Sequence, residues 1–150
     1  MTTIRKATIN DINDLTVLFN AYRVFYKKDP DIEKAKLFLS ARIENEESVI
    51  FVANDNENKL TGFVQLYPLF SSTRMQRLWL LNDLYIDERF RGLGISVALI
   101  DNAKEHCKKT NACGLMLETA RDNDIGNRLY PRTGFELDND HNYYFWEDGN

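Results

Sequence analysis

The sequence predicts an α/β fold of the mixed α+β type, with a central, mostly antiparallel sheet flanked by helices. A short strand comes first, followed by two segments with helical apolar spacing and then by three strand-like segments. The last of these strands, a glycine-rich loop and the start of an amphipathic helix occupy residues 82–99, and another strand-like segment follows that helix. Because a helix that joins neighbouring strands makes them parallel, the sheet should contain one parallel pair.

The N-terminal half predicts a short strand, two helices and a hairpin. A strand over residues 3–7 precedes Asn10, a residue type that caps helix N-termini. The helix that follows ends near residues 27–28 and carries an apolar stripe made of Ile12, Leu15, Leu18, Phe19, Tyr22 and Phe25. A second helix is expected over residues 31–43. Strands over 48–53 and 60–69, joined by a polar turn, form the hairpin.

The C-terminal half alternates strands and helices. A strand over residues 78–87 leads through the glycine-rich loop into a helix whose apolar residues keep helical spacing. A strand over 114–119 and a short helix over 122–132 follow, and we expect Pro131 to break that helix and Gly134 to close it. Residues 135–137 and 143–146 are rich in β-formers and predict a closing hairpin.

Length and composition describe an ordinary globular domain. A chain of 150 residues, 43% hydrophobic and 28% charged, predicts a single domain over residues 1–150. No apolar run reaches the ~20 residues of a membrane span, and the N-terminus lacks the apolar region of a signal peptide. Cys107, Cys113 and the two histidines form no ligand cluster, so we expect no metal, reduced thiols and a cytoplasmic location. The net charge of −4 argues against nucleic-acid binding and is compatible with a cationic substrate.

An anion-binding loop is predicted between the strand that ends at residue 87 and the helix that follows. The first N–H groups of a helix lack intrahelical partners, and together with the helix dipole they favour a phosphate. Gly92 and Gly94 let such a group approach the backbone, while Arg89 and Arg91 add cationic donors. The loop has neither the G-K-[ST] of a nucleotide P-loop nor the G-x-G-x-x-G of dinucleotide-binding folds.

Two elements of the chain resemble those of the GNAT superfamily of N-acetyltransferases. The first is R-x-x-G-x-G at residues 89–94, which is similar to the acetyl-CoA loop of that superfamily. The second begins at Asn123 and reaches Tyr130 seven positions later, with Gly134-Phe135 after it. A predicted helix and a predicted strand separate the two elements. The resemblance implies a GNAT-like fold in which the two parallel strands splay apart.

The resemblance also implies a set of contacts with acetyl-CoA as co-substrate. The backbone of Leu84 and Ile86, on either side of Tyr85, should hydrogen-bond the pantetheine arm as an added strand would. Asn123 should bond the same arm or the backbone beside it, and the Tyr130 hydroxyl should lie near the thioester sulfur as general acid. The pyrophosphate should bind the loop and helix start, formed by Arg89, Arg91, Gly92, Leu93, Gly94, Ile95 and Ser96.

Two residues depart from the pattern of the superfamily. Ser96 stands where a further glycine is common, so its hydroxyl either adds a phosphate contact or crowds the site. Pro131 stands where a charged residue is commoner, and it disfavours α geometry at the residue before it. Tyr130 is therefore expected at a distorted helix end. Without its spacing to Asn123, Tyr130 would be interpreted as a core aromatic residue.

Two carboxylates are candidates for activating the acceptor amine. An amine with a pKa near 10.4 is mostly protonated at pH 7 and must lose a proton before it attacks. Asp83, just before the pantetheine strand, and Glu118, at the end of the next strand, are candidates for the base or for attracting the cation. Each has a structural alternative, because a carboxylate at a strand end also bonds neighbouring loops.

The sequence therefore predicts an acetyl-CoA-dependent N-acetyltransferase that transfers acetyl directly to a primary amine, without a cysteine nucleophile. The acceptor is a small amine, a polyamine or a lysine side chain, since residues 81–88 and the aromatic C-terminus look similar to the polyamine, diamine and protein-lysine branches. The alternative is a non-catalytic acyl-CoA-binding sensor on the same fold. The aromatic residues 143–146, and the dimers common in the superfamily, predict a homodimer.

Overall fold

The computed structural model of the chain describes residues 1–149, which form two units. The first unit, Met1–Glu118, contains a sheet with α1, α2 and α3, and the second begins at Thr119 and contains α4 (Asp124–Arg132). A single domain over residues 1–150 stays a prediction. No helix in the described part of the chain is both long enough and apolar enough to cross a membrane.

The first unit is built on a five-stranded sheet in the order β1-β2-β3-β4-β5. Its first four strands are antiparallel to their neighbours, whereas β5 pairs with β4 in parallel. The strands span Thr3–Lys6 (β1), Val49–Asn54 (β2), Leu60–Ser71 (β3), Gln76–Ile86 (β4) and Leu115–Met116 (β5). The predicted mixed sheet with one parallel pair is therefore confirmed.

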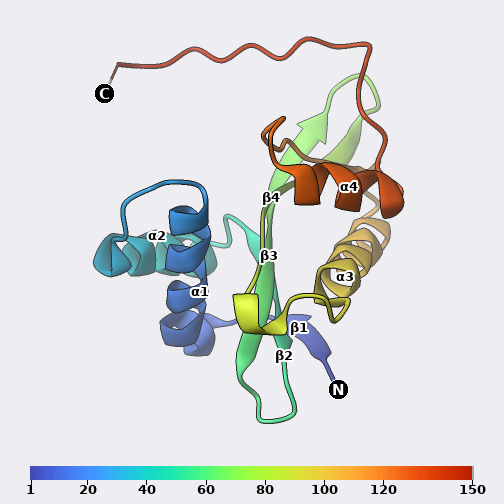
Figure 1. Cartoon of the computed structure of the whole chain (residues 1–150). Helices are drawn as coiled ribbons and strands as arrows, with labels where there is room; N and C mark the ends of the chain where they lie inside the picture. The colour runs from blue at the N-terminus through green and yellow to red at the C-terminus, as the bar shows by residue number, and fades with distance from the viewer. Residues whose placement is uncertain (150) are drawn as a thin grey trace. The chain divides into compact units, whose positions relative to one another are not determined.

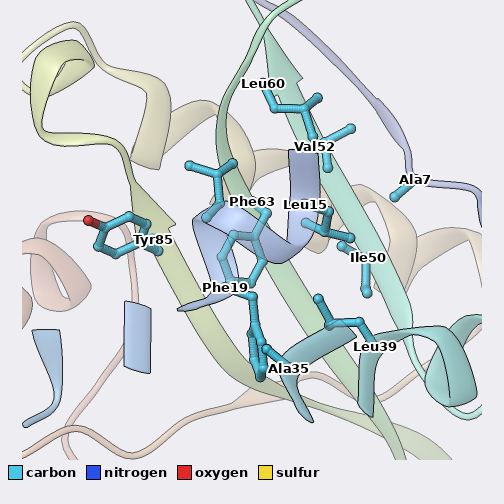
Figure 2. Close-up of a cluster of buried hydrophobic side chains, with 11 residues drawn as sticks. Ala7, Leu15, Phe19, Ala35, Leu39, Ile50, Val52, Leu60, Phe63 and Tyr85 are labelled. Carbon is cyan, nitrogen blue, oxygen red and sulfur yellow. The ribbon is translucent and has the colours of Figure 1, made fainter. Parts of the chain in front are cut away.

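Helices cover both faces of this sheet. Helices α1 (Ile12–Phe25) and α2 (Ile32–Glu44) lie on one face, and α3 (Ile95–Lys109) lies on the other, as Figure 1 shows. Figure 2 shows the core under α1 and α2, where buried side chains of both helices meet those of β2, β3 and β4. This cluster contains Ala7, Leu15, Leu18, Phe19, Ala35, Leu39, Ile50, Val52, Leu60, Phe63 and Tyr85.

The entry to α1 differs in detail from the prediction. Asn10 does not cap α1, because it lies inside a 3₁₀ turn, η1 (Ile9–Asp11). Thr8 caps that turn instead, and the Asp11 carboxylate accepts a hydrogen bond from the Thr8 backbone N–H at 2.9 Å, which forms a capping box. Asp11 also pairs with Arg5 of β1 at 2.7 Å, and this ion pair ties the strand to the start of the helix.

The closing hairpin predicted for the C-terminus is wrong, because residues 135–149 contain no strand. The polar turn between the two predicted strands bonds to itself, and the Asp138 carboxylate accepts hydrogen bonds from the N–H groups of Asp140 and His141 and from the Tyr143 hydroxyl. Such local bonds compete with a ladder. Tyr143, Tyr144, Phe145 and Trp146 are all at least 70% exposed.

Pro131 does not break α4, which continues to Arg132. Proline is tolerated here because the residues after it still find helical acceptors. Thr133 N–H donates to the Leu129 carbonyl at 3.0 Å, and Gly134, in the left-handed region, donates to the Pro131 carbonyl at 3.1 Å. Tyr130 therefore lies on a regular last turn, and the distorted helix end expected from the sequence is absent.

Candidate active site

A bulge interrupts the ladder between β3 and β4 at Asn82. Gln65 lies opposite Asp83 and Leu66 lies opposite Leu81, so Asn82 has no partner on β3. An extra residue of this kind bends its strand and frees its backbone groups from the ladder. The bulge divides β4 into a segment that also pairs with β5 and a segment that does not.

The second segment of β4 presents an open edge on the side of β5. Strand β5 pairs only with Trp79 and Leu80, and no strand among residues 1–149 pairs with Leu84, Tyr85 or Ile86 on that side. An open edge of this kind can accept an extended ligand by strand addition. The Ile86 carbonyl is already engaged, because it accepts a hydrogen bond from Nε of Arg91 at 3.0 Å.

The glycine loop leads from this edge into α3. Gly92 and Gly94 have φ angles of +78° and +79°, which L-residues with a Cβ rarely adopt. A Cβ built on either glycine meets no atom within 4 Å, so the space beside both is open. Leu93 between them is exposed and Ile95 is buried, which anchors the first turn of α3.

The N-terminus of α3 has the features of an anion site. Its N-cap, Gly94, has no side chain to satisfy the first N–H groups, and the first turn contains no acidic residue. Ser96, half-buried, lies in that turn and adds a hydroxyl to the N–H groups. Oriented N–H groups and the helix dipole together favour a phosphate here.

The two arginines of the loop have partners within the protein. Arg89 pairs with Asp87 at 2.6 Å, and this hydrogen bond lowers the pKa of Asp87 to about 2. The guanidinium of Arg91 lies 5.6 Å from the ring centre of Phe25 and 5.4 Å from that of Tyr85, within cation–π range. Both arginines bring positive charge to the loop, and their partners restrict how each side chain can move.

Asp83 is a buried carboxylate, only 2% exposed. One of its oxygens accepts a hydrogen bond from Nε2 of Gln65, and the other accepts one from Nδ2 of Asn82 at 2.6 Å. Burial raises the pKa of Asp83, against the opposite effect of its hydrogen bonds to Gln65 and Asn82 and of the nearby Tyr22 hydroxyl. No ion pair among residues 1–149 includes Asp83. A buried carboxylate without a cation is uncommon, and such groups concentrate at functional sites.

Gln65 and Tyr22, which complete this cluster, were not predicted as site residues. Gln65 is fully buried and also accepts a hydrogen bond from the Ser48 hydroxyl at 2.8 Å. The Tyr22 hydroxyl donates to the Asn82 carbonyl at 3.3 Å. The available signal was the presence of polar residues within apolar strands, Gln65 in V-Q-L-Y and Asp83 in L-N-D-L, because a polar side chain facing a core requires a partner.

The remaining predicted site residues lie on either side of the boundary between the units. Glu118 is the last residue of the first unit, exposed and two positions beyond β5. In the second unit, Asn123 caps α4: its Oδ1 accepts a hydrogen bond from the Gly126 N–H at 3.2 Å and its Nδ2 donates to Thr119 Oγ1 at 2.8 Å. Tyr130 lies two helical turns later, half-buried, with its ring centre 5.7 Å from that of Phe135.

Among residues 1–149, no group of three or more histidine, cysteine or acidic side chains is placed to hold a metal ion. The candidate site of the first unit therefore combines an open strand edge, a helix start suited to an anion and the buried Asp83, which all lie on β4 or directly after it. These features are the ones expected of a site for an extended, phosphate-bearing ligand.

Comparison with known proteins identifies the family. The chain belongs to the acetyltransferase (GNAT) family, whose model matches residues 13–135. It is 41% identical over 135 residues to an uncharacterized N-acetyltransferase, YhfO, of Bacillus subtilis, covering 90% of each chain. A crystal structure of a probable acetyltransferase is 34% identical, with a TM-score of 0.94 and 99% of each chain covered. The protein is thus an N-acetyltransferase by family.

A more distant structure shares the fold alone. It is a predicted acetyltransferase of Clostridium acetobutylicum with acetyl-CoA, at 18% identity and a TM-score of 0.78, with 97% of this chain and 96% of that chain covered. The GNAT resemblance predicted from the two sequence elements is therefore confirmed, and so is the fold class.

Proposed function

We propose that this protein transfers the acetyl group of acetyl-CoA directly to a primary amine. The observation that carries the proposal is the continuity of the open edge of β4 with the glycine loop at the start of α3. The edge offers backbone groups to an extended amide-containing arm, and the helix start offers N–H groups to a pyrophosphate. Acetyl-CoA carries these two features in that order along one molecule. The acetyl-CoA in the Clostridium acetobutylicum structure supports the same choice of ligand.

The chemistry requires one base and one acid. The amine nitrogen attacks the carbonyl carbon of the thioester, a C–N bond forms, the C–S bond breaks, and the amine gives up a proton. Asp83 and Glu118 are the candidates for drawing that proton and for attracting the cation, and the raised pKa of Asp83 makes it the better base. The Tyr130 hydroxyl is the candidate acid for the departing thiolate, since a phenol remains protonated at neutral pH.

The acceptor is a primary amine carried by a small amine, a polyamine or a lysine side chain. The net charge of −4 favours approach of a cation. Near β4, the buried Asp83 adds a negative charge that no cation of the described residues neutralises. A positively charged acceptor bound near β4 would be attracted by this charge without contacting the buried carboxylate.

A screen of amines tests the proposal. Spermidine, 1,4-diaminobutane, lysine peptides and simple monoamines are each incubated with acetyl-CoA, and release of the free CoA thiol is recorded. We expect release that depends on one of these amines, and acetylated product by mass spectrometry. Binding of acetyl-CoA without amine-dependent release would instead favour a non-catalytic sensor. Asp83→Asn and Glu118→Gln then assign the carboxylate, because loss of the base should lower kcat about 100-fold or more.

A further inference from the structure

We infer that Tyr22 is a catalytic residue, whose hydroxyl passes the proton of the acceptor amine to Asp83. The inference deepens the proposed function and rests on it, since it requires an amine acceptor. Neither sequence motif lies on α1, and Tyr22 reaches the site because α1 packs beside the bulge of β4.

Asp83 cannot receive the amine directly. It is 2% exposed, and its two oxygens are engaged by Gln65 and Asn82. An acceptor amine in solvent cannot contact a carboxylate that is so completely covered. If Asp83 acts as the base, another group must therefore conduct the proton from the substrate to the carboxylate.

Tyr22 is placed to be that group. It is half-buried on α1, and its hydroxyl donates to the carbonyl of Asn82, the residue next to Asp83 in the chain, at 3.3 Å. Asn82 is the bulged residue, so its carbonyl lies where the ladder is open. Rotation of the Tyr22 O–H bond moves its hydrogen from the Asn82 carbonyl toward Asp83, and leaves a lone pair of the phenolic oxygen for the substrate.

The ring of Tyr22 is held in place by its neighbours. Its centre lies 6.1 Å from that of Phe19, 6.0 Å from Phe63 and 5.0 Å from Tyr26. A further contact, at 6.5 Å, joins it to Tyr85 of β4. Packing on several sides restricts the rotamers of the ring, which keeps the hydroxyl near the bulge.

The electrostatics of the cluster suit a relay rather than an ionising tyrosine. Burial and the charge of Asp83 raise the pKa of Tyr22, and the same causes raise the pKa of Tyr67 to about 12. Tyr26 acts on Tyr22 in the same direction, and Arg42 of α2 opposes the shift at Tyr67. Tyr22 thus remains protonated and can accept a proton only as it donates its own. The step balances: the ammonium loses one proton, Tyr22 exchanges one, Asp83 gains one, and the neutral amine keeps its electron pair for attack.

The test compares Tyr22→Phe with Tyr26→Phe, using the best acceptor of the amine screen. Tyr22→Phe keeps the ring and removes the hydroxyl, while Tyr26→Phe makes the same change one helical turn away, outside the relay. We expect Tyr22→Phe to lower kcat/KM for the amine about 100-fold at pH 7. Acetyl-CoA affinity by calorimetry and the melting temperature should stay near the parent values, and Tyr26→Phe should match the parent throughout.

The dependence on pH separates a relay from a structural role. Without a relay, the enzyme depends on amine that is already neutral in solution, a fraction that rises tenfold per pH unit below the amine pKa of about 10.4. The deficit of Tyr22→Phe should therefore shrink to about fivefold or less by pH 9.5. Asp83→Asn should show the same profile, and the double variant should be no slower than either single variant.

Several results would overturn the inference. A Tyr22→Phe variant within threefold of the parent at pH 7 excludes the relay, and a deficit that is equal at every pH shows a packing role. Additive losses in the double variant also exclude a shared path. If the parent enzyme acetylates none of the amines, the proposed function fails, and the relay fails with it. If the parent acetylates an amine and Tyr22→Phe matches it, only the relay fails.

Discussion

Replacing Gly94 with glutamate should have two separate effects. The backbone strain should lower the melting temperature slightly, and the added negative charge should lower the affinity for acetyl-CoA. Gly94 is the N-cap of α3, with φ of +79°, and a Cβ there meets no atom within 4 Å. The cost to folding is therefore backbone strain alone, about 1–2 kcal/mol. An unfolding entropy of about 2.1 cal/mol/K per residue, over the 150 residues, converts that cost into a melting temperature lower by about 3–6 °C.

The effect on binding should be larger than the effect on folding. A carboxylate at the N-cap competes for the N–H groups at the start of α3 and repels a pyrophosphate. Loss of one charge-assisted hydrogen bond, about 1.5–3 kcal/mol, corresponds to an affinity lower by about 10- to 150-fold. Gly94→Gln is the matched control, because glutamine has the same size and the same backbone strain without the charge.

Calorimetry with acetyl-CoA provides the measurement. We expect the acetyl-CoA affinity of Gly94→Gln to fall between those of the parent and Gly94→Glu. Gly94→Glu should melt no lower than Gly94→Gln, because a carboxylate is favourable at a helix N-terminus. Raising the salt concentration should narrow the difference between them, because salt screens exposed charges. A folded Gly94→Glu variant that binds acetyl-CoA within twofold of the parent would refute the assignment of the pyrophosphate to this loop.

Three further predictions concern the acid, the half-buried His106 and the C-terminus. Tyr130→Phe should lower kcat about 100-fold with acetyl-CoA affinity nearly unchanged, and turnover within threefold of the parent from pH 6 to 9 would show that another donor serves the sulfur. Burial lowers the pKa of His106, whose ring contacts Phe51 and Trp79 and whose buried Nε2 has no partner among the described residues. The neutral His106 therefore contributes fully to the free energy of unfolding above the unfolded-state pKa of about 6.5, and this contribution is lost as the pH falls toward the lower pKa of the folded state. The melting temperature should fall between pH 7 and pH 5, and less so in His106→Gln; an equal fall in both would contradict this. The molar mass from light scattering at tens of micromolar should be that of a homodimer for the parent and that of a monomer once residues 143–149 are removed. A monomeric parent would contradict a dimer that forms through the exposed aromatic residues.

The parts of the site that a short stretch of chain can build were predictable from the sequence. The glycines of the loop adopt the left-handed region, α3 begins directly after Gly94, and Asn123 caps α4. Each of these depends on residues within a turn or two of one another. The limits of the prediction appear where chain segments must find each other: the hairpin proposed for 135–146 does not form, and β5 is shorter than expected.

The sequence by itself determined the class of fold, the glycine loop at the start of α3 and the presence of a carboxylate in β4, because hydrophobic periodicity and glycine chemistry are local properties. The tertiary structure alone decided what surrounds that carboxylate. The bulge at Asn82 arises from the register between β3 and β4, which places Asp83 opposite Gln65. The Asn82 carbonyl meets the hydroxyl of Tyr22, which lies 60 residues away in the chain. Register and helix packing depend on contacts between distant segments, so the partners, the burial and the pKa of Asp83 could not be deduced from the residues beside it.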